Sequence, residues 1–146
     1  MGKKMIKRLI AGMLTAAVAI PTNFMPVQAA KQTAEDYVIY PTPHKMEYQE
    51  GDYILGKEMN VIYDTGIDEA TKDRLEEAAA LKDIKVKESD EPKKGATNVY
   101  VGVHGEDGKA EDYITKEYAP GDALFENTDS YFLASDENVI SVLGKD

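Results

Sequence analysis

The 146-residue chain has no cysteine, no tryptophan and only two histidines. Without cysteine it has neither a disulfide framework nor a thiolate metal site, so a hydrophobic core must hold the fold. Basic residues are the minority, with 17 lysines and arginines against 27 aspartates and glutamates. Proteins that bind nucleic acids neutralise phosphates with lysine and arginine, so this charge balance argues against that class of function.

The chain also lacks an apolar run long enough to cross a membrane. The longest run, residues 9–20, has twelve residues, whereas a span needs about 20. Four basic residues precede the run, Pro21 follows it, and Val27-Gln28-Ala29 has the small residues that signal peptidase reads. This pattern predicts a signal peptide over residues 1–30, cleaved after Ala29 or Ala30, and favours it over a retained anchor. A secreted, extracellular protein without membrane attachment follows.

Removing residues 1–30 takes away four of the 17 basic residues and no acid, so 13 remain and the formal charge moves from −10 to −14. The acids are spread along the chain, which is typical of a solvated surface. Residues 31–36 are polar and are expected to be flexible. The remaining residues, 37–146, are enough for one small domain and too few for two.

Short segments with strand character alternate with two helical ones. A helix is predicted over residues 68–82, with Asp68 as its N-cap, and a shorter one over residues 110–118. The predicted strands are residues 45–49, 52–55, 60–63, 84–87, 98–103, 130–135 and 139–143. The fold class is therefore α/β (α+β-like), a mixed, partly antiparallel sheet packed against about two helices, too few to cover both faces.

Asp64-Thr65-Gly66 follows a predicted strand and matches the signature of aspartic proteases. That chemistry needs two aspartates that share one proton, and the sequence has no second copy. The following residues lead into a helix. The interpretation that we favour is a strand-to-helix turn in which Gly66 supplies a positive φ.

Gly102, Gly105 and Gly108 lie between a strand and a helix, where phosphate-binding loops occur. Their spacing matches neither phosphate-binding motif, and Glu106-Asp107 would repel a phosphate. The alternating acidic pattern of a calcium loop is absent as well. These glycines therefore predict a tight turn.

The remaining candidate groups are histidines and acidic pairs. With only His44 and His104 and no cysteine, a zinc site is disfavoured. Glycoside hydrolysis needs two convergent carboxylates, or one acid and a substrate acetamido group. The acidic pairs Glu35-Asp36, Glu106-Asp107 and Glu111-Asp112 are more simply explained as solvated turn or helix-face residues. The residues alone indicate no catalytic residue, no cofactor site and no metal site.

Several tyrosines fall in predicted strands, where packing is their expected role. They are Tyr48, Tyr53, Tyr63, Tyr100 and Tyr131.

The order of segments nevertheless resembles a known family. Ile39-Tyr40-Pro41-Thr42-Pro43 opens it, and Asn138-Val139-Ile140-Ser141-Val142-Leu143-Gly144-Lys145-Asp146 closes it. Over residues 37–146 the chain resembles the N-terminal non-catalytic domain of secreted bacterial β-N-acetylglucosaminidases of glycoside hydrolase family 84, including hyaluronidase-like enzymes. A related domain precedes the barrel in family 20 hexosaminidases.

The resemblance implies a mixed sheet packed against helices and placed ahead of a catalytic (β/α)8 barrel. It also implies a retaining, substrate-assisted mechanism that uses an aspartate pair in that barrel. No such positions occur in this sequence, so the chain by itself is expected to be inactive. It is expected to lack the last helix of the domain and the barrel, both of which would follow Asp146.

Two functions of different classes follow. The first is an accessory domain of a secreted glycosidase that acts on N-acetylglucosamine-containing glycans, with the catalytic barrel in cis as its partner. The alternative is a free-standing extracellular glycan-binding or adhesion module. A half-site aspartic protease is a weak third. In each of these readings the two prolines Pro41 and Pro43 mark the chain's approach to a sheet edge.

Overall fold

The computed structural model describes residue 39, residues 41–48 and residues 55–145. The chain divides into two units, Met1–Tyr48 and Gln49–Asp146, each of which is considered by itself. The predicted signal peptide over residues 1–30 and the predicted flexible segment over residues 31–36 lie outside the described residues. Both therefore stay predictions.

In the first unit, residues 41–48 contain neither a strand nor a helix. The predicted strand over residues 45–49 is therefore wrong for residues 45–48. Its expected hairpin partner, residues 52–55, lies outside the described residues except for Leu55, which is in no strand. Period-2 alternation predicts which residues share a side, but a strand also needs a hydrogen-bonded ladder. Lys45 and Glu47, which the alternation puts on one side, form an exposed ion pair of 2.5 Å.

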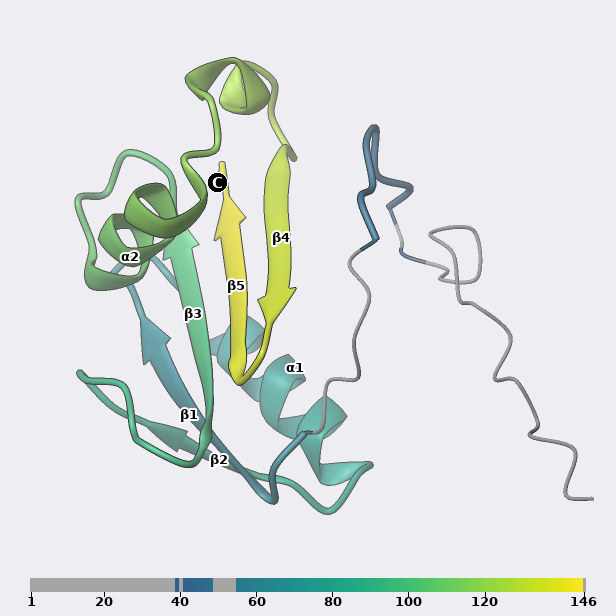
Figure 1. Ribbon diagram of the computed structural model, residues 1–146, viewed down its shortest axis with the longest axis vertical. Coiled ribbons are helices and arrows are strands. Elements are labelled where there is room, and N and C mark those ends of the chain that lie inside the picture. Colours follow the sequence, from purple (N-terminus) through teal and green to yellow (C-terminus); the bar gives the residue numbers. More distant parts are fainter. Residues whose placement is uncertain (1–38, 40, 49–54, 146) are drawn as a thin grey trace, which may run out of the picture. The chain divides into compact units, whose positions relative to one another are not determined.

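The second unit contains the described helices and strands, which Figure 1 shows with their labels. In chain order the elements are β1 (Glu58–Tyr63), α1 (Glu69–Ala80), β2 (Lys85–Glu88), β3 (Thr97–Val103), α2 (Lys109–Tyr118), the 3-10 helix η2 (Asp122–Phe125), β4 (Tyr131–Asp136) and β5 (Val139–Gly144). Each predicted element between residues 60 and 143 is present, with bounds shifted by one or two residues. The 3-10 helix η2 was not predicted.

The strands form one five-stranded sheet in the order β2-β1-β3-β5-β4. Strands β2, β1, β3 and β5 run parallel to one another, and β4 pairs with β5 in the antiparallel direction. This confirms the predicted α/β class with a mixed sheet, and it confirms the hairpin at the end of the chain. Strand β3 lies at the centre, and its first six residues are buried, as its nearly continuous apolar sequence predicts.

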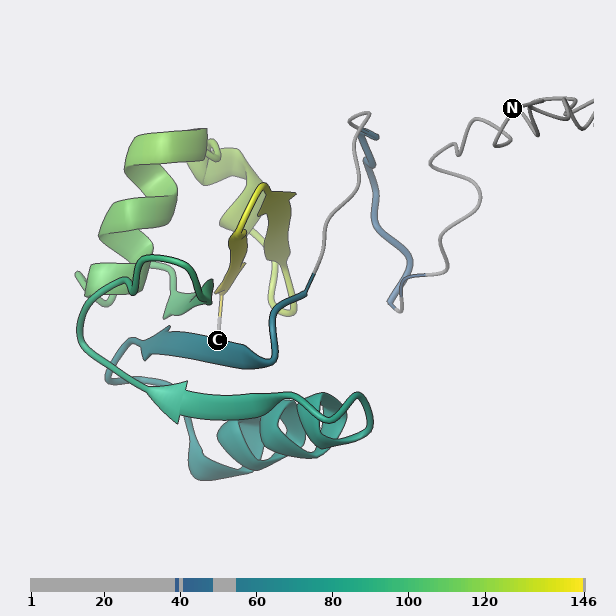
Figure 2. The same cartoon turned by 60° about the horizontal axis from the view of Figure 1, so that its bottom comes forward.

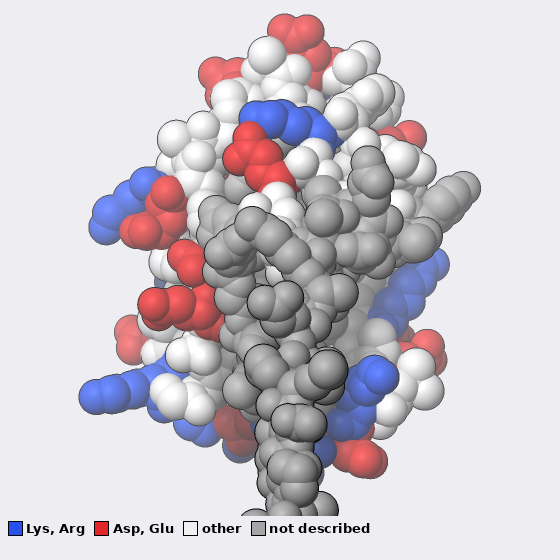
Figure 3. Space-filling view, turned by 45° about the vertical axis from the view of Figure 1, so that its right-hand side comes forward, with Lys and Arg blue, Asp and Glu red and all other residues white. Residues whose placement is uncertain are grey.

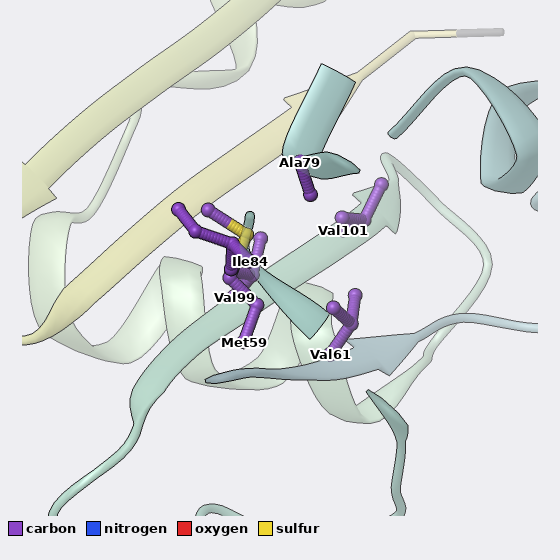
Figure 4. Close-up of a cluster of buried hydrophobic side chains, with 6 residues drawn as sticks. All are labelled: Met59, Val61, Ala79, Ile84, Val99 and Val101. Atoms are coloured by element: carbon purple, nitrogen blue, oxygen red, sulfur yellow. The ribbon is translucent and has the colours of Figure 1, made fainter. Parts of the chain in front are cut away.

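The two helices lie on opposite faces of the sheet, as Figure 2 shows. Successive side chains of a strand point to opposite faces, so β1 and β3 contribute to a separate core on each side. Figure 4 shows the core on the α1 side, which consists of Met59, Val61, Ala79, Ile84, Val99 and Val101. The core on the α2 side consists of Ile62, Tyr100, Ala110, Ile114, Phe125 and Leu143.

The coverage of the two faces is unequal. Helix α2 packs over β1, β3 and β5, whereas α1 packs against β2 at the edge of the sheet and reaches the apolar side chains of β1 and β3 through Ala79 and Leu75. On the α1 face, Val103 and Val142 are only half-buried, and Leu133 is 45% exposed. The two helices thus cover one face well and the other in part, which refines the expectation that they are too few for both faces.

Helix α1 begins where its sequence predicts. The Asp68 carboxylate accepts a hydrogen bond of 2.6 Å from the Thr71 N–H, so it satisfies one of the free donors of the first turn. The helix ends at Ala80, two residues before the prediction. Leu81 is its C-cap, and Asp83 adopts a positive φ of 55°, which a continuing right-handed helix does not allow.

Lysines and acids are intermixed on the face of the molecule shown in Figure 3, where no block of one sign is visible. At the start of β1, the Glu58 carboxylate pairs with Lys87 at 2.7 Å and also with Lys93. The hydrogen bonds from these two lysines lower the pKa of Glu58 to about 2. Over the described part of the chain, no helix has the length and apolar character of a membrane span.

Candidate functional site

The sequence candidates meet at the carboxyl ends of β1 and β3. These strands are adjacent and parallel, and the chain leaves them towards opposite faces, to α1 after β1 and to α2 after β3. In open α/β sheets, ligands bind at such a divergence. The residues found there are Asp64, Gly102, His104, Gly108 and Glu111, and we call them the Asp64–Glu111 cluster.

Asp64 is buried, with 4% of its surface exposed. Its carboxylate accepts hydrogen bonds from the backbone N–H groups of Ala110, at 2.8 Å, and Glu111, at 3.0 Å. These donors belong to the first turn of α2, whose own N-cap, Gly108, has no side chain to offer. A carboxylate at this place also complements the positive end of the helix dipole. Asp64 therefore caps α2 from a position 46 residues earlier in the chain.

Two of the three glycines make room for this carboxylate. A Cβ atom on Gly102 would lie 2.5 Å from Asp64 Oδ2, and one on Gly108 would lie 2.0 Å from Asp64 Cγ and Oδ1. No side chain fits at such distances. The glycines are therefore explained by the approach of a protein carboxylate, which occupies the position that a bound phosphate would need. This excludes a phosphate loop at the start of α2.

Glu111 holds the turn between β3 and α2. Its carboxylate accepts hydrogen bonds from the N–H groups of Gly105, at 2.6 Å, and Asp107, at 2.9 Å. Gly105 and Asp107 both adopt positive φ, at 89° and 52°. His104 Nδ1 lies 3.1 Å from Glu111 Oε1, and the His104 ring stacks on Phe125 with a centroid distance of 4.2 Å. The cluster thus ties the turn, the helix and η2 together.

The prediction that Glu111 is a solvated helix-face residue is therefore wrong, because Glu111 is 9% exposed and bonded to the backbone. The position of Glu111 in the sequence does indicate this structural role. Glu111 is the third residue of α2 after the N-cap Gly108, where a glutamate commonly reaches back to backbone N–H groups. Its neighbour Asp112 is exposed, as predicted, and so are Glu106 and Asp107 in the turn.

The Asp-Thr-Gly motif forms the expected strand-to-helix turn, which closes with a hydrogen bond of 3.1 Å from Ile67 N–H to the Asp64 carbonyl. The prediction of a positive φ at Gly66 is wrong, since Gly95 and Gly105 are the glycines with positive φ among the described residues. A four-residue turn of this kind forms with negative φ throughout. Because both Asp64 oxygens accept backbone hydrogen bonds, they are not available to share a proton with a second aspartate.

The other candidates are considered by the part of the chain to which they belong. His44 belongs to the first unit and is exposed, and Glu35-Asp36 and Tyr53 lie outside the described residues. Tyr63, Tyr100 and Tyr131 are in strands, as predicted, whereas Tyr48 is not. In the described part of the chain, no group of three histidine or acidic side chains is placed to hold a metal ion.

Comparison with known proteins gives similarities of two kinds, to a protein family and to solved structures. Residues 36–146 match the family described as "Glycosyl hydrolase family 20, domain 2". Among solved structures, the chain is similar to CpGH84D, a GH84 enzyme, with a TM-score of 0.72 and 39% sequence identity. The match covers 77% of this chain and 19% of CpGH84D, so the chain spans about a fifth of that protein. No curated protein is similar enough to count as a match.

These similarities confirm the resemblance to the N-terminal non-catalytic domain of hexosaminidase-like enzymes. They also agree with the site. Its buried carboxylates have backbone partners, and the groups that remain exposed around it are turn residues. The Asp64–Glu111 cluster thus holds the turn after β3, the start of α2 and η2 together.

Proposed function

The chain belongs to the family of glycosyl hydrolase family 20, domain 2, and from this premise we propose that it is the accessory domain of a secreted β-N-acetylglucosaminidase or hyaluronidase-like enzyme. The observation that carries the proposal is the match of residues 36–146 to this domain, together with a span of only 19% of CpGH84D. The parent enzyme would act on N-acetylglucosamine-containing glycans. The signal-peptide pattern of residues 1–30 supports secretion.

The chemistry of the domain supports a role without catalysis. Glycosidases place two carboxylates about 5–9.5 Å apart around the substrate, or use the acetamido group of the substrate itself beside an acid. Among the described residues, the buried carboxylates are those of Asp64 and Glu111, and each accepts two backbone hydrogen bonds. The reaction would therefore be carried out by a catalytic domain in cis.

The partly covered sheet face offers a surface for that domain. Helix α1 lies over β2, and on the same face Leu133 is 45% exposed beside the half-buried Val142. Apolar surface that a domain leaves open is typical of contacts with another domain. Packing a catalytic domain on this face would remove Leu133 and its neighbours from water, which stabilises the pair of domains.

The experiment that tests the proposal is a hydrolysis assay with a chromogenic aryl N-acetyl-β-D-glucosaminide. We expect the purified chain to release product no faster than buffer does, while a complete family 84 enzyme serves as the positive control. Turnover that is proportional to the concentration of the pure chain would contradict the accessory role. Loss of that turnover in Asp64→Asn would then assign it to the Asp64–Glu111 cluster.

A further inference from the structure

A hollow lies at the amino ends of β3 and β5, at the opposite end of β3 from the Asp64–Glu111 cluster. It has a volume of about 340 Å³ and is open to solvent. Three segments line it: the loop before β3, the last turns of α2 and the turn between β4 and β5. Volumes of a few hundred Å³ are typical of sites for small ligands.

The two rims of this hollow are held by one buried residue, Asn98, through its side chain on one rim and its backbone N–H on the other. Its amide donates to the Lys93 carbonyl at 3.1 Å, and its Oδ1 accepts from the Lys93 N–H at 2.7 Å. Asn60 donates to the same oxygen at 3.1 Å. The Asn98 backbone N–H donates to the Asn138 carbonyl at 2.8 Å, which fixes the β4–β5 turn. Both rims are therefore in place before a ligand arrives, which lowers the entropic cost of binding.

Two half-buried tyrosines of α2 line the hollow between these rims. Tyr113 stacks on the buried Tyr100, with a centroid distance of 3.8 Å and an interplanar angle of 6°. Tyr118 packs against Phe132 at 5.5 Å. Burial raises the pKa of Tyr113 to about 12, and it raises the pKa of Tyr118 as well. Both phenols are therefore neutral at neutral pH, and packing fixes both rings. The Tyr118 hydroxyl has Ser141 as a hydrogen-bond partner inside the domain.

Charges of both signs surround these rings. Lys93 and Lys94 lie on one rim, and Asp136 and Glu137 lie on the other. Such a balance does not select a polyanion, because a phosphate-rich ligand needs clustered cations. Amide, carboxylate and phenol groups beside aromatic rings suit a neutral ligand with many hydroxyl groups and one apolar face, since a ring packs on the apolar face and the polar groups bind the hydroxyls.

We infer that this hollow binds a short neutral oligosaccharide through Tyr113 and Tyr118, with Asp136 and Asn138 as hydrogen-bonding groups. The assignment of N-acetylglucosamine as its sugar unit rests on the function proposed above. A domain with this site would hold the glycan chain while the parent enzyme cuts it. The saccharide site is distinct from the Asp64–Glu111 cluster.

The test is an NMR titration of the full ¹⁵N-labelled chain with tri-N-acetylchitotriose, and with cellotriose as the matched sugar that lacks acetamido groups. We expect saturable shifts of the backbone amides around Asn98, Tyr113, Tyr118 and Asn138, and smaller shifts with cellotriose. Equal shifts with both sugars would overturn the assignment of the sugar unit. The absence of shifts, or shifts confined to another surface, would overturn the saccharide site itself.

Variants locate the site. Tyr118→Ala should weaken binding about tenfold, the loss expected when one aromatic contact is removed. Glu117→Ala changes an exposed residue next to Tyr118 on the same helix and should leave binding unchanged. If Tyr118→Ala does not fold, Asp136→Ala on the exposed rim should still weaken binding roughly three- to tenfold, because it removes one hydrogen-bond acceptor. Wild-type affinity in a folded Tyr118→Ala or in Asp136→Ala would contradict the proposal.

The titration and the hydrolysis assay test the saccharide site and the accessory role independently. Binding by an inactive chain supports both proposals, whereas an inactive chain without binding overturns the saccharide site alone. A chain that hydrolyses the aryl glycoside overturns the accessory role, whatever the titration shows.

Discussion

Replacing Asp64 with alanine is expected to lower the free energy of unfolding by about 3 kcal/mol. The carboxylate accepts hydrogen bonds from the buried N–H groups of Ala110 and Glu111. The substitution by alanine leaves both N–H groups without an acceptor at the start of α2. Each hydrogen bond to a charged group contributes roughly 1.5–3 kcal/mol, and local relaxation keeps the total below the sum of two. Urea unfolding followed by circular dichroism measures the change.

Asp68 provides the matched control. It caps α1 through the Thr71 N–H, but at an exposed position, so Asp68→Ala should cost about 1 kcal/mol. The structural role of Asp64 would be refuted if Asp64→Ala cost no more than Asp68→Ala. A catalytic aspartate behaves in the opposite way, since removing a strained functional group is often neutral or stabilising.

Gly108→Ala should destabilise the domain to a similar extent, by about 3 kcal/mol. The backbone of Gly108 has φ −90° and ψ 166°, which any residue adopts, so the cost does not arise from the backbone. It arises because the new Cβ would lie 2.0 Å from Asp64 Cγ, and either the helix or the carboxylate must move. The same urea unfolding experiment measures the loss.

Gly121→Ala is the control for this substitution. Gly121 also has an ordinary φ of −71°, and nothing lies within 4 Å of its Cβ position, so alanine should be neutral or stabilise by about 0.5 kcal/mol. The double variant Asp64→Ala/Gly108→Ala should cost clearly less than the sum of the single variants, because the first change removes the atoms that the second collides with. Strict additivity would show that the two residues do not contact each other.

The elements that the sequence predicts well are those with local causes. Residues 60–63 and 98–103 are rich in β-branched and aromatic residues and are bounded by turn residues. They form most of strands β1 and β3. The helix over residues 68–82 has its own N-cap in Asp68 and became α1. In each case the physical cause lies within a few residues of its effect, so periodicity and capping rules apply directly.

The candidate site depends on contacts between residues that are far apart in the sequence, and the sequence does not reveal these contacts. The sequence correctly predicts a turn at Asp64, but the N–H groups that its carboxylate binds lie 46 and 47 residues later in the chain. The need for glycine at positions 102 and 108 can be understood only once β1 is known to lie beside β3, because both glycines make room for the Asp64 carboxylate. Strand order and the approach of one side chain to a distant helix are set by tertiary packing, on which a single sequence carries no pattern.

The most direct test of the central claim, that this domain serves a catalytic domain in cis, is to sequence the coding DNA beyond the codon for Asp146. The account predicts an open reading frame that continues into a glycosidase catalytic domain, or remnants of one behind a recent stop codon. A stop codon followed by intergenic DNA without any such remnant would contradict it.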